Sequence, residues 1–135
     1  MYLLDTNAVS EFVSSIDGPV ARKVARVGHG NLIISPVVLG EIEYGLAKRP
    51  DSTVAQDAGR IARTISTPPL GDETTAVYGS LRRKYEASGQ SIDANDLWIA
   101  SQAIALGAVL VSADKVFERV EEVTLENWAL GASGE

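Results

Sequence analysis

Residues 92–120, IDANDLWIASQAIALGAVLVSADKVFERV, carry the pattern that decides the fold. Asp93 precedes a strongly apolar segment that ends at Gly107, a residue type that terminates many helices. The apolar run at 108–111 then has the length of a buried strand, and Ser112 and Asp114 follow it. A buried helix joined directly to a buried strand predicts an α/β unit.

Two strand-then-helix units precede this stretch. Residues 1–4 form a short apolar run that ends at Asp5, a capping residue type, before an apolar pattern at 8–13. Residues 32–34 end at Ser35-Pro36, which predicts a helix through about residue 48. We also expect helices over 20–27, 52–65 and 72–88, a turn or short helix at 113–116, a last strand near 122–125, and Trp128 packed on the body. Short apolar strands separated by helices predict an α/β fold with a short central parallel sheet flanked by helices on both faces.

Length and composition narrow the class of protein. A chain of 135 residues without repeats or linkers is close to one typical domain of about 150, so we expect residues 1–135 to form a single domain. The absence of cysteine excludes disulfides, thiolate zinc sites and cysteine catalysis, and suits a reducing cytoplasm. The single histidine, His29, excludes a mechanism that needs two imidazoles.

Charge and hydropathy add two expectations. The net charge of −6 is the wrong sign for strong non-specific binding to nucleic acid. No apolar run approaches the roughly eighteen residues of a membrane span, and Asp5 lies where an export signal carries basic residues. We therefore expect no membrane association and a cytoplasmic location.

Four acidic residues from distant segments fall where a parallel sheet places its ligands, beyond the carboxyl ends of the strands. They are Asp5, Glu41, Asp96 and Asp114. Converging carboxylates cannot all stay ionised near neutral pH unless cations or donors neutralise them. Hard oxygen ligands suit Mg²⁺ or Mn²⁺, and such a site can activate water against a phosphodiester without histidine.

Each acid also has a simpler explanation. Asp5 is a good helix cap, Asp114 suits a turn, and Asp96 suits the third position of a capping box with Asp93 as N-cap. Glu41 and Glu43 flank the apolar stripe of their helix on opposite sides, so periodicity does not choose between them.

Taken together, residues 3–11 (LLDTNAVSE), 34–46 (ISPVVLGEIEYGL), 92–120 and 126–128 (ENW) resemble a PIN domain, and more narrowly the VapC-type toxins of bacterial type II toxin-antitoxin systems. The resemblance implies a metal-dependent endoribonuclease that is usually a homodimer and is held inactive by a cognate VapB-type antitoxin. A non-toxin RNA-processing nuclease or an inert RNA-binding module of the same fold is the alternative.

The resemblance also assigns residues. It implies that the metal-binding and catalytic acids are Asp5, Glu41, Asp96 and Asp114, which selects Glu41 over Glu43. Thr6, Asn7 and Ser112 match small polar positions that support these carboxylates. Asp93 is either an outer ligand or the helix cap.

Candidate partner-binding residues are less specific. The basic residues that could face RNA are Arg22, Lys23, Arg26, Arg60, Arg63, Arg82, Arg83 and Lys84, although each also suits an ordinary solvated helix face. An amphipathic antitoxin segment could dock in apolar grooves of the helical surface, for example around Phe12, Val13, Tyr44 and Leu46.

Overall fold

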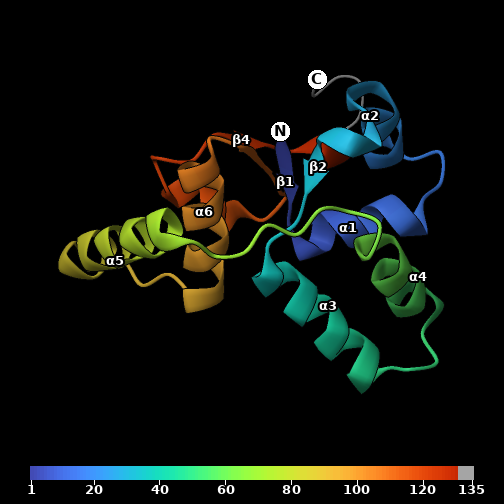
Figure 1. Ribbon diagram of the computed structural model, residues 1–135, viewed down its shortest axis with the longest axis horizontal. Coiled ribbons are helices and arrows are strands. Elements are labelled where there is room, and N and C mark those ends of the chain that lie inside the picture. Colours follow the sequence, from blue (N-terminus) through green and yellow to red (C-terminus); the bar gives the residue numbers. More distant parts are fainter. Residues whose placement is uncertain (131–135) are drawn as a thin grey trace.

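A four-stranded parallel sheet lies at the centre of the computed structural model, which describes residues 1–130 (Figure 1). Its strands are short and follow the order β2-β1-β3-β4. Their bounds are β1 Tyr2–Leu4, β2 Leu32–Ile33, β3 Val109–Val111 and β4 Leu125–Glu126. All three neighbouring pairs are parallel, so the predicted parallel sheet is confirmed.

Strand β1 occupies the interior of the sheet. Leu3 lies opposite Ile33 on one side and Leu110 on the other, and these three side chains are buried. Beyond β2, the backbone N–H of Ile34 donates to the carbonyl of Ser66, which extends the sheet by a single bridge. Strands buried on both faces read as continuous apolar runs, which is why such short segments were recognisable.

Within residues 1–130, six α-helices surround the sheet, and three 3₁₀ helices occupy loops. The α-helices are α1 Thr6–Ser14, α2 Pro19–Val27, α3 Pro36–Lys48, α4 Thr53–Ala62, α5 Asp72–Ala87 and α6 Ala94–Leu106. The 3₁₀ helices are η1 His29–Asn31, η2 Lys115–Arg119 and η3 Trp128–Leu130. In Figure 1, α5 and α6 lie together on one side of the molecule and α1, α3 and α4 on the other, so the expected covering of both faces is confirmed.

Side-chain caps begin several of these helices. Asp5, Ser35, Ser52 and Asp93 each accept a hydrogen bond from a backbone N–H in the first turn that follows. Gly107 ends α6 with a φ of 65°, a left-handed conformation that glycine adopts without steric cost. The residue types that predicted where these helices begin and end therefore act as caps in the structure.

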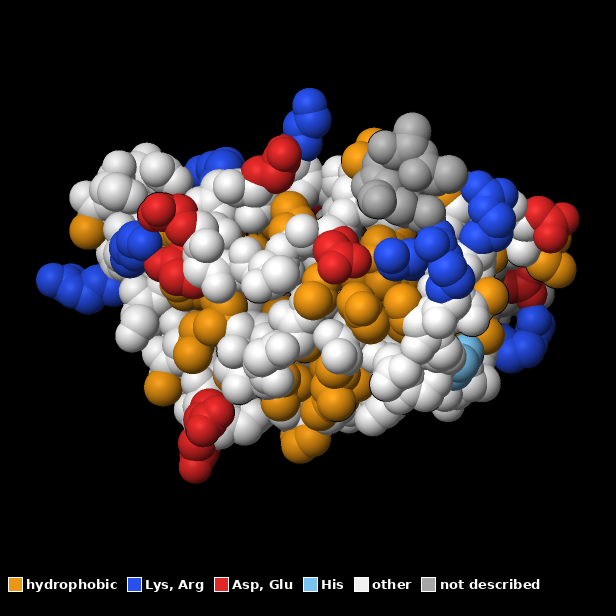
Figure 2. Space-filling view, turned by 90° about the horizontal axis from the view of Figure 1, so that it is seen from above, with side chains coloured by type: hydrophobic (Ala, Val, Ile, Leu, Met, Phe, Trp, Pro, Cys, Tyr) orange, Lys and Arg blue, Asp and Glu red, His pale blue; other side chains and the backbone are white. Residues whose placement is uncertain are grey.

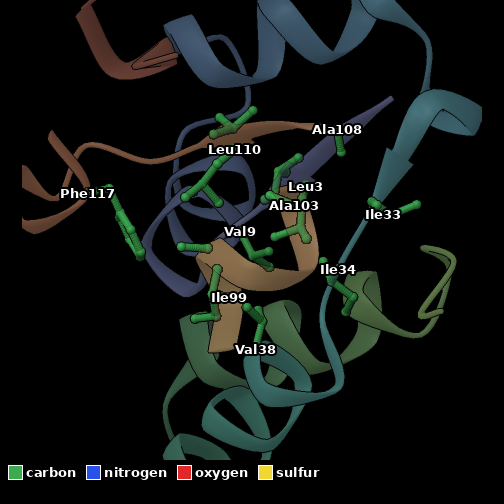
Figure 3. Packing of buried hydrophobic residues seen from close by; sticks show 14 of the residues in the cluster. Leu3, Val9, Ile33, Ile34, Val38, Ile99, Ala103, Ala108, Leu110 and Phe117 are labelled. Carbon is green, nitrogen blue, oxygen red and sulfur yellow. The ribbon is translucent and has the colours of Figure 1, made fainter. Parts of the chain in front are cut away.

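One hydrophobic cluster fills the space between sheet and helices. Figure 3 shows Leu3 and Leu110 from the sheet packed near Ile99 and Ala103 of α6 and Val9 of α1. Trp128 is 4% exposed, as the sequence predicted for the end of the described chain. Within residues 1–130, no helix combines the length and the apolar character that crossing a bilayer demands.

Some expected boundaries were wrong. The last strand is Leu125–Glu126 rather than 122–125, because Glu122 turns toward α5 and bonds to Lys84 and Tyr85. The fourth helix ends at Ala62 rather than 65, since the chain must turn before Ser66 to pair beside β2. The turn expected at 113–116 is the 3₁₀ helix η2, which starts two residues later.

Candidate active site

The topology brings the four predicted acids to one end of the sheet. Asp5 follows β1 directly, and Asp114 follows β3 after two residues. Gly107 connects the last turn of α6 to the start of β3. The first turn of α6, which contains Asp96, therefore lies at the other end of the sheet, beyond the carboxyl ends of the strands. Glu41 lies in the second turn of α3, the helix that begins just beyond β2.

Asp5 is the most enclosed of the four acids, with 5% of its surface exposed. Its Oδ1 accepts a hydrogen bond of 2.8 Å from the N–H of Ala8, and its Oδ2 accepts one from the hydroxyl of Ser112. Burial raises the pKa of Asp5 above its ordinary value, while the bonds from Ser112 and Ala8 act in the opposite direction. The helix-cap explanation is thus correct for Oδ1, but each oxygen retains a lone pair for another partner.

Ser112 connects the ends of β1 and β3. Its hydroxyl donates to Asp5 and accepts a 2.9 Å hydrogen bond from the N–H of Asp114. Asp114 in turn caps η2 through Oδ1, 3.0 Å from the N–H of Val116, and is otherwise exposed. Ser112 therefore contacts the carboxylate of Asp5 but only the backbone of Asp114.

Thr6 supports Glu41 in the same way. The Thr6 hydroxyl donates a 2.7 Å hydrogen bond to Oε1 of Glu41, which joins the start of α1 to the second turn of α3. Glu43 faces elsewhere, because it pairs with Arg63 of the segment after α4. The structure thus places Glu41, and not Glu43, beside the residues that follow β1.

Asp96 is half-buried, and its carboxylate takes no hydrogen bond from the described residues 1–130. Its pKa is raised to about 6, first by burial and then by the negative charges of Asp93, Asp114, Glu41 and Asp5. The four predicted acids therefore act on one another electrostatically, although they come from four separate segments.

Two other predicted residues lie at the margin of this cluster. Asp93 caps α6 by accepting a 3.1 Å hydrogen bond from the N–H of Asn95. The reciprocal bond of a capping box, from the Asp93 N–H to Asp96, is absent from the described chain, so Asp96 is not a capping-box acid. Asn7 is exposed, and within residues 1–130 its side chain bonds to nothing.

The donor chemistry of the cluster fits a hard divalent cation. All its ligand atoms are oxygens, and mutually repelling carboxylates favour positive charge among them. Within residues 1–130, no three acidic or histidine side chains are spaced to enclose one ion directly. A close group of three is not required for Mg²⁺, which keeps several waters and takes only one or two carboxylates in direct contact.

The predicted RNA-facing residues do not gather around the acids. Arg60 pairs with Asp57, Arg63 with Glu43, and Lys84 with Glu121 and Glu122. Arg82 pairs with Glu86 and bonds to the hydroxyl of Tyr78, and Arg83 lines a shallow pocket with it on α5. Arg22, Lys23 and Arg26 belong to α2, and Figure 2 shows basic side chains over that part of the surface.

A groove that the sequence did not reveal begins at Glu41. It has a volume of about 350 Å³ and runs between α1, α3 and α4. Thr6 and Glu41 line one part, and Lys48, Arg49 and Ser52 line another. The spacing of Glu41, Gly45 and Lys48 places them on one face of α3, but the groove itself depends on how α1 and α4 pack beside that face.

The predicted apolar docking site is split in the structure. Phe12 and Val13 line a groove of about 380 Å³ with Ile16 of the loop after α1 and Ile61 of α4. Tyr44, which is 66% exposed, and Leu46 lie on α3 and do not border it. An apolar groove is therefore present at Phe12 and Val13, whereas Tyr44 and Leu46 do not line it.

Comparison with known proteins agrees with this architecture. The family model for the PIN domain matches residues 2–123, and the chain belongs to the PIN domain family. Within that family, it is 34% identical over 133 residues to Ribonuclease VapC2 of Rickettsia felis, covering 95% of this chain and 98% of that protein. It is also 27% identical to Ribonuclease VapC2 of Haemophilus influenzae strain Rd, covering 94% and 97%.

A solved structure gives the same result. The crystal structure of VapBC2 from Rickettsia felis bound to a DNA fragment from its promoter superposes with a TM-score of 0.84 at 31% identity, over 94% of this chain and 98% of that chain. The resemblance to VapC-type PIN domains that the sequence motifs indicated is therefore confirmed.

Proposed function

We propose that this protein is a metal-dependent endoribonuclease and the toxin of a type II toxin-antitoxin system. The single observation that carries the nuclease proposal is the position of Asp5, Glu41, Asp96 and Asp114 at one end of the parallel sheet of a PIN domain, where burial and neighbouring negative charges raise the pKa of Asp96. Neighbouring carboxylates raise one another's pKa, so a cation among them stabilises their ionised form. Carboxylates with perturbed pKa values are also common at functional sites.

In this proposal, the cation ligands are Asp5, Glu41, Asp96 and Asp114, with some contacts made through water. When bound, Mg²⁺, or Mn²⁺ in its place, supplies a water of lowered pKa and offsets charge on the phosphodiester. Ser112 orients the Asp5 carboxylate, and Thr6 orients that of Glu41, through the hydrogen bonds described above. Asp93 remains outside this set as the cap of α6.

Attack by water leaves a 5′-phosphate and a 3′-hydroxyl on the cleaved RNA. Attack by the RNA 2′-hydroxyl would instead leave a 2′,3′-cyclic phosphate, and the protein has only one histidine to serve such a reaction. The chemistry of the new ends therefore separates the two mechanisms.

The partner proposed is a VapB-type antitoxin, by analogy with the VapBC2 complex of Rickettsia felis. An amphipathic segment could place apolar side chains in the groove lined by Phe12, Val13, Ile16 and Ile61. Homodimer formation and a cytoplasmic site of action complete the proposal, and both rest on the family resemblance.

The test of the nuclease proposal is cleavage of total bacterial RNA by the wild-type protein and by Asp96→Asn, each with Mg²⁺ and with chelator. Asp72→Asn is the matched control, because Asp72 is also an acid in the first turn of a helix but lies on α5. We expect the wild type and Asp72→Asn to cut only with metal and to leave 5′-phosphates. Equal inactivity of all three proteins, or cyclic phosphate ends, would contradict the proposal.

The toxin proposal needs its own test. Co-expression with the neighbouring gene should yield a complex that copurifies and is inactive on RNA, and Val13→Asp in the apolar groove should release the active nuclease. A nuclease that elutes alone and is active in the presence of the neighbouring gene product would argue for an RNA-processing enzyme instead.

A further inference from the structure

We infer that Lys48 and Arg49 form a binding site for RNA backbone phosphates, at the far end of the groove that begins at Glu41. This inference rests on the proposed nuclease function and adds the residues that hold the substrate. Both residues line the same groove as Glu41 and Thr6. Neither is among the basic residues that the sequence pattern brought forward.

The geometry of α3 links the two ends of the groove. Glu41, Gly45 and Lys48 follow the i, i+4, i+7 spacing of one helix face, and Gly45 lines the groove between the other two. Seven residues of helix rise by about 10 Å, so Lys48 lies that far along the axis from Glu41. A strand with its scissile phosphate at the acids would reach Lys48 within a few nucleotides.

The two side chains keep their positive charge available. Within residues 1–130, neither Lys48 nor Arg49 forms an ion pair, whereas Arg60, Arg63, Arg82 and Lys84 all do. The ammonium of Lys48 lies 5.3 Å from the centre of the Tyr44 ring, which positions the cation without neutralising it. Both basic side chains are exposed and free to meet a phosphate.

The net charge of the molecule favours a local basic site for RNA. At a net charge of −6, the protein as a whole does not attract RNA. Cations that line a groove close to the acids can offset the repulsion between the negative protein and RNA, since contacts to phosphates supply most of the sequence-independent affinity for nucleic acid. The groove also offers the hydroxyls of Ser10 and Ser52, which suit phosphate and sugar oxygens.

A simpler explanation is that both cations stabilise the carboxyl end of α3, where the helix dipole favours positive charge. The experiment must therefore separate stability from RNA binding. Lys48→Ala/Arg49→Ala removes the proposed site, and Arg60→Ala/Arg82→Ala is the control, because it makes the same change in net charge at two cations that Asp57 and Glu86 already neutralise.

Binding of a fluorescently labelled, single-stranded oligoribonucleotide is measured by anisotropy over a salt series, in an Asp96→Asn background that prevents cleavage. We expect the Lys48/Arg49 variant to bind about tenfold more weakly at low salt, with a salt slope reduced by about 1.4, or about 0.7 for each phosphate that is no longer neutralised. The Arg60/Arg82 variant should keep the parent affinity, because both cations already pair with acids. In the cleavage-competent background, the Lys48/Arg49 variant should raise KM with little change in kcat.

Three results would overturn the inference. One is unchanged RNA affinity in the Lys48/Arg49 variant, another is an equal loss in the Arg60/Arg82 variant, and the third is a loss of affinity that follows only a fall in Tm. Retained RNA affinity with lost antitoxin binding would assign the groove to the protein partner. Failure of the parent protein to bind or cut any RNA would instead reject the proposed function itself.

Discussion

The hydroxyl of Ser112 donates a hydrogen bond to Oδ2 of Asp5 and so joins the ends of β3 and β1 across 107 residues of sequence. Asp5 is otherwise buried beside apolar strands, where an ionised carboxylate is costly unless donors surround it. The bond therefore stabilises the fold, and under the proposed function it also orients the Asp5 carboxylate for metal binding.

Ser112→Ala tests this bond. Because the bond lowers the pKa of Asp5 against the effect of burial, its loss should raise that pKa and reduce the free energy of unfolding at neutral pH by about 1–3 kcal/mol. Ser101→Ala is the matched control, since Ser101 is also fully buried but donates only to the carbonyl of Leu97 in its own helix. Urea denaturation at pH 7 measures the free energy of unfolding of both variants. Equal losses would show that a hydrogen bond to the Asp5 carboxylate contributes no more stability than one to a backbone carbonyl.

Asp96→Asn should raise Tm in the presence of chelator. The folded protein holds the pKa of Asp96 at about 6, above the ordinary 3.8, so it binds more protons than the unfolded chain between these values. Stability then falls as pH rises through this window and stays reduced above it. Asp96→Asn lacks this loss of stability. Its gain in Tm over the wild type should therefore be full above about pH 6 and absent below about pH 4.

Thermal denaturation over this pH range checks the prediction, with Asp72→Asn again as control. A Tm difference between Asp96→Asn and wild type that does not depend on pH would mean that Asp96 does not titrate as described.

Much of this site could be predicted because its signals are local. Asp5, Ser35 and Asp93 each follow an apolar strand or loop as capping residues, and the structure uses all three as caps. The alternation of buried strands and helices then determined which end of the sheet the acids share, because the carboxyl ends of parallel strands lie together.

Other features depend on contacts that no local pattern encodes. Glu41 and Glu43 are equivalent by periodicity, and only the hydrogen bond from Thr6 and the pairing of Glu43 with Arg63 distinguish them. Arg63, Arg82 and Lys84 looked available for RNA until their acidic partners became visible, and two of those partners, Glu121 and Glu122, lie far along the chain. The groove with Lys48 depends on the packing of three helices, which sequence spacing alone does not describe.

Divalent cations should stabilise the wild-type protein. A ligand that binds only the folded state adds about 2.7 kcal/mol at about one hundred times its Kd, so Mg²⁺ should raise Tm in a concentration-dependent manner. The rise should be much smaller in Asp96→Asn and should decline below about pH 6, where Asp96 becomes protonated. Calorimetry at constant ionic strength measures the effect, and an identical rise in wild type and variant would place the ion elsewhere.

Thr6→Val should reduce kcat while the fold stays intact. The substitution preserves shape but removes the hydroxyl that holds Oε1 of Glu41 at 2.7 Å. Loss of a group that orients a metal-binding carboxylate typically costs about 10- to 100-fold in activity or metal affinity. Thr6→Ser should restore most of the rate because it returns the donor, and failure of this rescue would count against an orienting role.

Tyr85→Phe tests the contact that displaced the last strand from its predicted position. The buried Tyr85 hydroxyl donates to Glu122 at 2.7 Å and accepts from the N–H of Glu121 at 3.1 Å, which attaches α5 to the segment before β4. Burial and the hydrogen bond with Glu122 raise the pKa of Tyr85, so the phenol stays protonated and remains a donor at neutral pH. Its removal should reduce the free energy of unfolding by about 1–3 kcal/mol, because it leaves the Glu121 N–H without its partner.

Tyr44→Phe is the control for this variant, since Tyr44 is 66% exposed and its hydroxyl forms no hydrogen bond within residues 1–130. It should leave stability unchanged, as surface substitutions usually do. If Tyr85→Phe also left the free energy of unfolding unchanged, the position of β4 would depend on the parallel pairing of Leu110 with Leu125 and not on the link to α5. Amide hydrogen exchange at Ser112 distinguishes these cases, because its N–H donates to the carbonyl of Glu126 and should exchange faster only when β4 loosens.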